Sequence, residues 1–380
     1  MYKFVMPEII FGSGSMKHTG ESCTRLGAKR VLIVTDEGVT QAGWSDLVET
    51  SCREAGLASF LFSNVSINPK DKEVESCARA YLDYECDALV GVGGGSAIDT
   101  AKAAAVLATN GGHIRDYEGV DRISSPLPPL VMVPTTAGSG SEVSQFSVIL
   151  DTDRQKKMTI VSKSLVPDIA VVDPDALSTK SSYLTASTGL DVITHAIESF
   201  VSVAATPLTD VHAKNALALS SRYLRPSVAS KYNKEAKEQM AMASLHAGLA
   251  FSNAILGAVH AMAHAIGGRY PFLHGDINAV LLPHVMEFNL LASPDKFKEI
   301  ASLMGEDVQS LSPSAAGEKA ISFVKKLSID IGVPLTLSEM GFEEAFIPEI
   351  SETALADACM ITNPRDITAE EVASLLRKAL

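Results

Sequence analysis

The sequence predicts an α/β domain followed by an all-helical domain. In the first half, short apolar and β-branched runs alternate with stretches long enough for helices, the pattern of a parallel sheet covered by helices. From about residue 183 the strand pattern nearly disappears, and long segments rich in Ala, Leu and Met follow. The length of 380 residues suits two or three domains and is ample for a buried core. We expect the α/β domain at residues 1–182 and the helical domain at residues 183–380.

Each strand expected in the first domain is an apolar run closed by polar or turn-forming residues. These runs cover residues 30–36, 57–62, 86–93, 129–134, 145–150, 157–161 and 168–174. The two runs at 145–150 and 157–161 flank a polar turn and predict a β-hairpin. Residues 71–84 are long enough for a crossover helix, so the main sheet is expected to be mostly parallel.

The helices expected in the second domain are periodic segments at residues 208–223, 234–252 and 294–303. The last helix begins after Thr368, which with Glu371 forms a capping-box pattern, and it runs towards Leu380.

Composition and charge weigh against two kinds of partner. Apolar residues make up 46% and charged residues 20%, as in ordinary globular proteins. A net charge of −13 argues against nucleic acid, because phosphate binding needs clusters of Lys and Arg, and argues weakly against anionic membranes. We find neither a signal-peptide pattern nor a run of about 18 apolar residues, so no membrane span is expected. The five scattered cysteines lack a CxxC pair and predict free thiols in a cytoplasmic protein.

A glycine-rich turn, GVGGGSAIDTAK at residues 91–102, follows a predicted strand and opens a helix. Glycines let the backbone approach a phosphate closely, and a helix N-terminus offers free N–H groups. Ser96 adds a hydroxyl, and Asp99 and Lys102 fall in the first helical turns. The pattern is neither GxGxxG nor a P-loop. It indicates a pyrophosphate-binding, Rossmann-like turn, and a tight turn for close strand–helix packing is the alternative.

Two further strand ends suit a nucleotide. Asp36 follows the first strong strand, where a carboxylate can bind a ribose 2′-hydroxyl and repel a 2′-phosphate, which favours NAD over NADP. A turn or helix cap is the alternative role for Asp36. The loop PTTAGSGSE at residues 134–142 carries hydroxyls and glycines suited to phosphate, ribose or nicotinamide, or is an ordinary loop.

A cluster of histidines and one aspartate predicts a divalent metal site. Asp191 and His195 share a helical face at i, i+4 spacing, as do His260 and His264. Gly267–Gly268 is expected to end the second helix, so that His274 follows a short turn. One carboxylate and three or four imidazoles can close around one ion.

The spacing alone leaves open whether His264 binds the metal or shuttles protons beside it. Glu198 and Asp276 are possible hydrogen-bonding partners of the ligands. Single buried, hydrogen-bonded core histidines are expected at His18, His113 and His212. The roles of His246 and His284 stay open.

These motifs together resemble the iron-dependent (group III) alcohol dehydrogenases, which have a dehydroquinate synthase-like fold. The resemblance runs along most of the chain, through FGSGS, GGGSAIDTAK, VPTTAGSGSEV, KMTIVS, PDIAVVDP, GLDVITHAIES, the histidine stretch and NPRDIT. It implies that Fe²⁺, or zinc or another divalent ion, is held by Asp191, His195, His260 and His274. It places His264 beside the metal without binding it, as a proton relay near the nicotinamide.

The resemblance also implies where cofactor and substrate lie. NAD(H) would contact Asp36, Asn68, Gly93, Gly94, Gly95, Ser96, Asp99, Thr135, Thr136, Ser139 and Lys157. The substrate pocket would include Phe146, Val148, Phe251 and Cys359. Phe146 departs from the lactaldehyde-reductase branch of this family, which carries Asn at that position.

The expected function is reversible hydride transfer between NAD(H) and a small primary alcohol or diol and its aldehyde. Alternatives on the same scaffold are a reductase of a short anionic aldehyde, or a glycerol dehydrogenase or dehydroquinate synthase-type metalloenzyme. A protein that binds metal or nucleotide without turnover is a further alternative. The family is usually at least dimeric, so we expect a homodimer or larger homo-oligomer.

Overall fold

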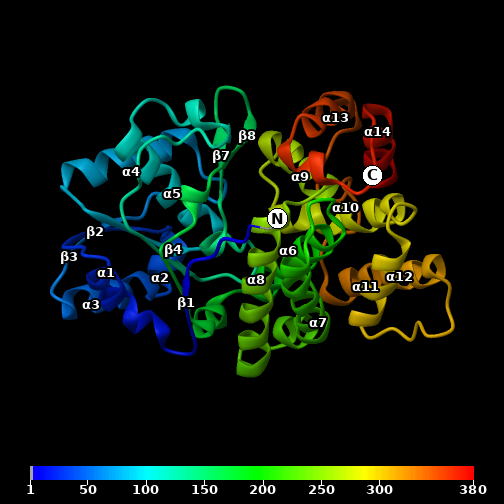
Figure 1. Cartoon of the computed structure of the whole chain (residues 1–380), viewed down its shortest axis with the longest axis horizontal. Helices are drawn as coiled ribbons and strands as arrows, with labels where there is room; N and C mark the ends of the chain where they lie inside the picture. Colours follow the sequence, from blue (N-terminus) through cyan, green and yellow to red (C-terminus); the bar gives the residue numbers. More distant parts are fainter. Residues whose placement is uncertain (1–2) are drawn as a thin grey trace. The chain divides into compact units, whose positions relative to one another are not determined.

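The computed structural model describes residues 3–380 and forms two compact units, one spanning Val5–Thr179 and the other Lys180–Leu380 together with the short segment that ends at Phe4 (Figure 1). The first unit is built on a parallel sheet with the strand order β1-β9-β6-β4-β2-β3. The second unit is helical. The predicted succession of an α/β and an all-helical part is therefore confirmed.

The main sheet contains the parallel strands that the apolar runs predicted. Its strands are β1 (Glu8–Phe11), β2 (Arg30–Val34), β3 (Ala58–Phe62), β4 (Ala88–Gly93), β6 (Leu130–Pro134) and β9 (Ile169–Val172). The edge strand β1 was not predicted from the sequence. It has only four residues, too few for a clear pattern of apolar residues. Its pairing with β9, which places Glu8 beside Ile169, is a long-range contact that the local sequence does not reveal.

Helices cover both faces of this sheet (Figure 1). Leu32 and Val34 of β2 pack in one core with residues of α4 (Asp71–Asp83) and α5 (Gly95–Asn110). Val31 and Ile33, which alternate with them, pack in the other core with residues of α1 (Thr19–Arg25) and α3 (Trp44–Glu54). Burial on both faces explains why the strands are almost purely apolar.

A small second sheet of the order β5-β8-β7 adjoins α5 in the first unit. Strands β7 (Phe146–Asp151) and β8 (Lys156–Val161) are antiparallel and pair Val148 with Thr159, which confirms the predicted hairpin. The two-residue strand β5 (Gly119–Val120) is too short to predict from the sequence.

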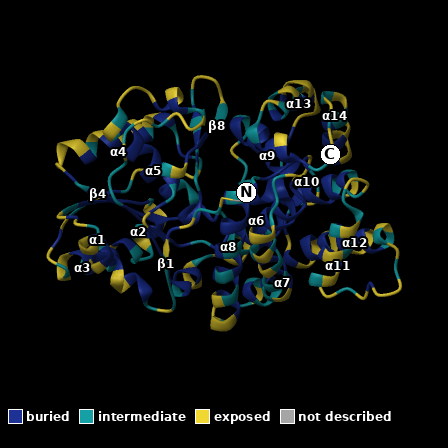
Figure 2. Ribbon diagram, viewed as in Figure 1, coloured by how far each residue is buried: buried dark blue, intermediate teal, exposed yellow. Residues whose placement is uncertain are grey.

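The helical unit buries its core between long helices, whose inner faces are dark in Figure 2. Its helices are α6 (Ser182–Val201), α7 (Pro207–Ala229), α8 (Lys234–Ala254), α9 (Ala258–Arg269), α10 (His274–Asn289), α11 (Pro294–Leu303), α12 (Pro313–Ile331), α13 (Ile347–Leu355) and α14 (Ala369–Lys378). The expected capping box is present, with Thr368 accepting from the backbone N–H of Glu371.

One predicted helix end is wrong. Helix α9 runs through Gly267 and Gly268 and ends at Arg269. Both glycines are buried, and packing there outweighs the intrinsic cost of glycine in a helix. His274 still follows a short turn and is the first residue of α10.

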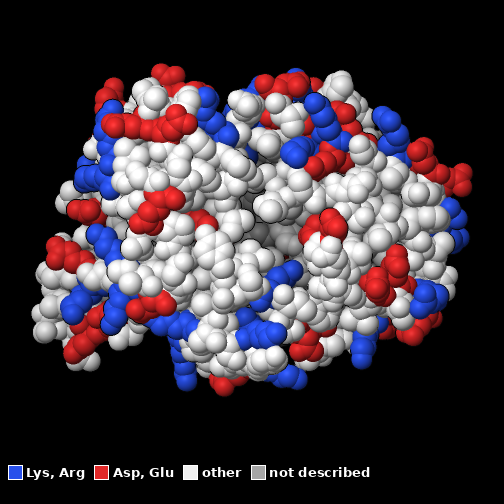
Figure 3. Space-filling model, turned by 180° about the vertical axis from the view of Figure 1, so that it is seen from behind, with Lys and Arg blue, Asp and Glu red and all other residues white. Residues whose placement is uncertain are grey.

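Two surface properties bear on partners. Within residues 3–380, no single helix is long and apolar enough to span a membrane; only α8 and α9, bent by 98°, would pass such a test as a pair. On the face of the described residues in Figure 3, Lys and Arg side chains are interspersed with Asp and Glu side chains.

Candidate active site

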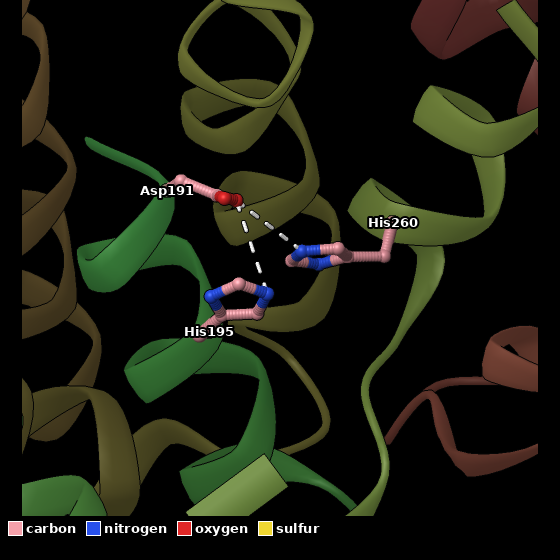
Figure 4. A group of neighbouring side chains, drawn as sticks. All are labelled: Asp191, His195 and His260. Carbon is pink, nitrogen blue, oxygen red and sulfur yellow. Dashed lines mark ion pairs between the residues drawn. The ribbon is translucent and has the colours of Figure 1, made fainter. Parts of the chain in front are cut away.

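Asp191 and His195 of α6 and His260 of α9 bring three ligand atoms together in the helical unit (Figure 4). Oδ1 of Asp191 lies 3.9 Å from Nε2 of His195 and 3.5 Å from Nε2 of His260. All three side chains are buried, and the two imidazole rings stack with their centroids 4.5 Å apart. Atoms that each lie about 2.0–2.2 Å from one ion are about 3–4 Å apart, so this set fits a single divalent cation.

Local backbone geometry directs His260 at α6. Between α8 and α9 the chain turns through Ile255, which has a φ of 60°, and Gly257. A Cβ on Gly257 would lie 2.9 Å from Oε1 of Glu198. Its absence lets Glu198 accept from the backbone N–H groups of Val259, at 2.7 Å, and of His260, at 3.3 Å. Helix α9 therefore begins against a carboxylate, with His260 in its first turn.

The same carboxylate orients the imidazole of His260. Oε2 of Glu198 lies 2.6 Å from Nδ1 of His260, which donates its proton and leaves Nε2 to face Asp191. Although burial lowers the pKa of His260, its hydrogen bonds to Asp191 and Glu198 raise it to about 9. Burial alone would raise the pKa of Asp191, but His195 and His260 hold it well below its usual range. A metal cation competes with protons for these same lone pairs.

Asn278 of α10 also reaches this point and was not predicted from the sequence. Its side-chain N–H donates to Oδ1 of Asp191 at 2.7 Å and lies 3.2 Å from Nε2 of His260. The amide is completely buried. It gives Asp191 a second partner and so fixes the rotation of the carboxylate.

His264 and His274 flank the three ligands. The ring of His274 is 5.3 Å from that of His260 and stacks on that of His264 at 5.4 Å. Nδ1 of His264 lies 3.0 Å from Oδ2 of Asp357, and the other oxygen of Asp357 accepts from the backbone N–H of Cys359 at 2.8 Å. The structure thus pairs His264 with Asp357, a carboxylate that the sequence did not single out. It places His274 beside His260 and His264.

Two of the residues expected around the substrate lie in this unit. Phe251 is buried and stacks on His195 with ring centroids 4.5 Å apart. Cys359 is buried and belongs with His264 and Asp357 to a second group of potential ligand atoms within 4.8 Å of one another. Asp276, considered as a partner of the ligands, accepts from the Tyr183 hydroxyl at 2.5 Å.

Other histidines depart from expectation. His18 and His113 have side chains 60% and 75% exposed, so they are not core residues. His212 is half-buried, and its Nδ1 lies 2.9 Å from Nδ1 of His246. The prediction of single core histidines is therefore wrong, because a sequence without periodic context does not reveal exposure.

The glycine turn lies in the α/β unit between β4 and α5. Gly93 has a φ of 157°, and a Cβ on it would lie 2.7 Å from Cβ of Ala97. A Cβ on Gly95 would lie 2.9 Å from Cβ of Ser139. No side chain caps the N-terminus of α5 within the described residues, so its first N–H groups are available to a phosphate.

The loop after β6 lies against this turn. A Cβ on Gly94 would be 3.3 Å from Oγ1 of Thr136, and the backbone N–H of Thr135 donates to Gly93 at 2.8 Å. The hydroxyl of Ser96 donates to the carbonyl of Ile67, which is the neighbour of Asn68. Turn, loop and Asn68 segment therefore surround the start of α5.

Asp36 caps a helix, which is the alternative role considered for it, and also lies close to the glycine turn. Its Oδ1 caps α2 (Glu37–Gln41) by accepting from Val39 at 2.9 Å. Its Oδ2 would lie 3.4 Å from a Cβ on Gly93, so this oxygen faces the glycine turn.

Asp99, Lys157, Phe146 and Val148 lie on α5 and the β7–β8 hairpin. Asp99 is buried, and its Oδ2 accepts from the backbone N–H of Val148 at 3.0 Å. Burial raises the pKa of Asp99 to about 6. Phe146 and Val148 are half-buried, and Lys157 pairs with Leu150 across the hairpin.

Comparison with known proteins covers both units. Residues 7–174 match the family model described as iron-containing alcohol dehydrogenase, and residues 185–380 match that of the Fe-containing alcohol dehydrogenase family, C-terminal. The 1,3-propanediol dehydrogenase of Klebsiella pneumoniae is 43% identical over 382 residues, with 100% of this chain and 99% of that protein covered. The NAD-dependent methanol dehydrogenase of Bacillus methanolicus is 41% identical, with 99% of each covered. A crystal structure of 1,3-propanediol oxidoreductase superposes with a TM-score of 0.97 at 43% identity and covers 100% of both chains.

Proposed function

The chain belongs to the iron-containing alcohol dehydrogenase family, and we propose that Asp191, His195, His260 and His274 hold its Fe²⁺ while the glycine turn of α5 holds NAD(H). The protein is an NAD(H)-linked oxidoreductase that interconverts a small primary alcohol or diol and its aldehyde. The convergence of Asp191 Oδ1 with Nε2 of His195 and His260 carries the proposal. Zinc or another divalent ion fits the same donors.

When bound, the ion supplies Lewis-acid stabilisation of negative charge on the substrate oxygen, and NAD⁺ supplies the hydride acceptor. The chain's own residues prepare this chemistry. Glu198 and Asn278 fix the orientation of His260 and Asp191, so that the ligand atoms need little reorganisation. Phe251, stacked on His195, keeps water from one side of that imidazole.

His264 is proposed to move the proton. Because Asp357 accepts from Nδ1 of His264, the proton-accepting nitrogen is Nε2. A histidine held in one tautomer can take a proton released from the alcohol and pass it towards water. In this assignment His264 divides the work with His260, its neighbour one turn earlier on α9.

The cofactor half of the site is proposed from the turn and the loops around it. N–H groups at the start of α5 would bind the pyrophosphate. Oδ2 of Asp36 would accept from the adenosine ribose and repel a 2′-phosphate, so NAD(H) is preferred. Further proposed contacts are Asn68, Gly93, Gly94, Gly95, Ser96, Asp99, Thr135, Thr136, Ser139 and Lys157.

The substrate is proposed to be a short, uncharged alcohol or diol. Phe146, Val148, Phe251 and Cys359 are apolar or weakly polar and suit a small carbon chain. The relatives named for 1,3-propanediol and methanol act on molecules of this class. A short anionic aldehyde would need a cationic side chain in the pocket. A homodimer or larger homo-oligomer in the cytoplasm is proposed as the working form.

One experiment tests the metal, the cofactor and the substrate class. The chelated protein is reloaded with Fe²⁺ or Zn²⁺ and assayed for NADH formation with 1,3-propanediol, methanol, ethanol and glycerol, and for NADH oxidation with neutral and anionic aldehydes. We expect turnover of short alcohols or diols only after reloading, with NADP⁺ much poorer. Full activity in the chelated protein would refute the metal assignment, and activity confined to anionic aldehydes would overturn the substrate proposal.

A further inference from the structure

Lys102 is a completely buried lysine on the third turn of α5. Its Nζ donates to three backbone carbonyls: Ser141 at 2.6 Å, Ser144 at 2.7 Å and Phe146 at 3.0 Å. The hydroxyl of Ser144 lies 3.3 Å from the same nitrogen. An ammonium group has three N–H donors, so the three carbonyls use the whole donor capacity of Lys102.

Asp99, one turn earlier on α5, fastens the same segment. Its Oδ2 accepts from the backbone N–H of Val148 at 3.0 Å, and its carbonyl accepts from the Ser147 hydroxyl at 2.9 Å. Lys102 and Asp99 thus form hydrogen bonds with five of the eight residues from Ser141 to Val148. The segment is therefore held firmly against helix α5.

The fastened segment joins the two places where ligands are proposed to bind. At its start it continues from Ser139, which lies so close to Gly95 of the glycine turn that a Cβ on Gly95 would be 2.9 Å from Cβ of Ser139. At its end it becomes β7, on which Phe146 and Val148 point to the same side of the strand. A shift of the segment would therefore move Ser139, which lies beside the glycine turn, and also Phe146 and Val148, which are proposed to line the substrate pocket.

The charge of Lys102 is balanced inside the unit. Glu142, 2% exposed, interacts electrostatically with Lys102, as does Asp99. Burial lowers the pKa of Lys102 to about 8 and raises that of Glu142 to about 7. Burying an ammonium group has a desolvation cost even when it is well hydrogen-bonded. The cost suggests that the geometry which Lys102 imposes is useful to the protein.

We propose that Lys102 is a positioning residue for both ligands, which locks the segment 141–148 onto α5 so that the glycine turn and the start of β7 keep one geometry. The inference rests on the proposed function, because it takes the turn as the NAD(H) site and Phe146 and Val148 as the pocket wall. It assigns to the lysine of GGGSAIDTAK a role distinct from direct phosphate binding, since its nitrogen is fully engaged by carbonyls.

The chain offers a matched control in the helical unit. Lys237 of α8 is also buried, 4% exposed, and its Nζ donates to the carbonyl of Ser227 at 2.9 Å. It fastens α8 to the end of α7 and touches none of the proposed ligand-binding residues. Replacing Lys102 or Lys237 by Met removes a buried ammonium that donates to backbone carbonyl oxygen, so the two variants separate positioning from simple stability.

The test compares Lys102→Met, Lys102→Gln and Lys237→Met in the metal-loaded full-length protein. NADH affinity is measured by quenching of the single tryptophan, Trp44, which lies in the α/β unit, and kcat and KM are measured with the best alcohol of the wild-type panel. For Lys102→Met we expect the Kd for NADH and the alcohol KM each to rise about tenfold, with a smaller change in kcat. Lys102→Gln, which keeps two N–H donors, should recover part of both losses. Lys237→Met should lower the melting temperature yet leave Kd and KM within about twofold.

Wild-type affinity for NADH in Lys102→Met, or equal losses in Lys237→Met, would overturn the inference while leaving the proposed function intact. If Lys102→Met does not fold, Lys102→Gln decides by the same measurements. Failure of the wild-type protein to bind NADH would overturn the proposed function itself, and with it the role of Lys102.

Discussion

Each of the two units buries a group of ionisable side chains, but the two groups are balanced in opposite ways. In the α/β unit the cation is part of the chain: Lys102 meets three carbonyls and has Asp99 and Glu142 nearby. In the helical unit, Oδ1 of Asp191 faces Nε2 of His195 and Nε2 of His260 at 3.5–3.9 Å. In the first arrangement, protein carbonyls accept from every N–H donor of the cation. The second is the donor set that a divalent cation stabilises.

The difference separates the roles of burial in the two units. Around Lys102, burial fixes the geometry of a loop, and three backbone carbonyls take up the whole donor capacity of the ammonium. Around Asp191, burial brings together potential ligand atoms for which protons and a metal ion compete. A buried charged group therefore indicates a metal or catalytic site only when its neighbours are further potential ligands and not groups that already satisfy it.

The largest expected effect comes from removing a ligand of the helical group. His260→Ala deletes one metal-binding nitrogen and the side-chain partner of Glu198, so metal content and turnover should be lost together, with activity reduced roughly 10³-fold or more. Metal analysis and steady-state kinetics on the purified variant measure this. His284→Ala, on half-buried His284 of α10, is the control and should keep both. Retention of stoichiometric Fe²⁺ by His260→Ala would show that His260 is not a metal ligand. The helical group would then no longer differ from the group around Lys102 in the way described.

The group around Lys102 predicts a pH dependence of stability. Burial raises the pKa of Glu142 from 4.5 to about 7, so between these values the folded protein holds a proton that the unfolded chain has released. The contribution of Glu142 to the free energy of unfolding must then fall as pH rises through this window. The shift corresponds to roughly 3 kcal/mol at most for this fully buried group.

Urea unfolding of wild type and Glu142→Gln between pH 4.5 and about 8 measures this contribution. Stability of the wild type relative to Glu142→Gln should decrease across the window. Glu118→Gln provides the opposite sign: although burial raises the pKa of Glu118, Arg154 and Lys156 lower it overall, so its contribution is lost as pH falls. A flat difference for Glu142 would mean that its pKa is not raised in the folded protein, so that its surroundings offset the effect of burial.

Much of both groups follows from sequence periodicity. The i, i+4 spacing of Asp191 and His195, the strand before the glycines and the helix after them are local properties, and the structure contains each of them. What remained hidden depends on distant packing. Asn278 meets Asp191 across 87 positions, and Asp357 meets His264 across 93. The end of α9 was misplaced for a related reason, since burial rather than propensity keeps Gly267 helical.

The smallest effect concerns Asn278, which the sequence did not reveal. If its amide only fills space, Asn278→Ala should lower stability and leave metal binding unchanged. If it orients Asp191, as its 2.7 Å hydrogen bond indicates, the affinity for Zn²⁺ or Fe²⁺ should fall about tenfold to a hundredfold. Competition with a chromogenic chelator measures the affinity directly.

A second buried amide of the same helix supplies the control for Asn278→Ala. Asn289 exchanges hydrogen bonds of 2.9 Å with Asn363 and has no ligand of the proposed metal among its partners. Asn289→Ala should therefore cost stability through the same kind of loss, with metal affinity within about twofold of wild type. Equal losses of affinity in the two variants would show that metal affinity depends on the packing of α10 in general. The contrast with the group around Lys102 would then rest on the metal ligands alone.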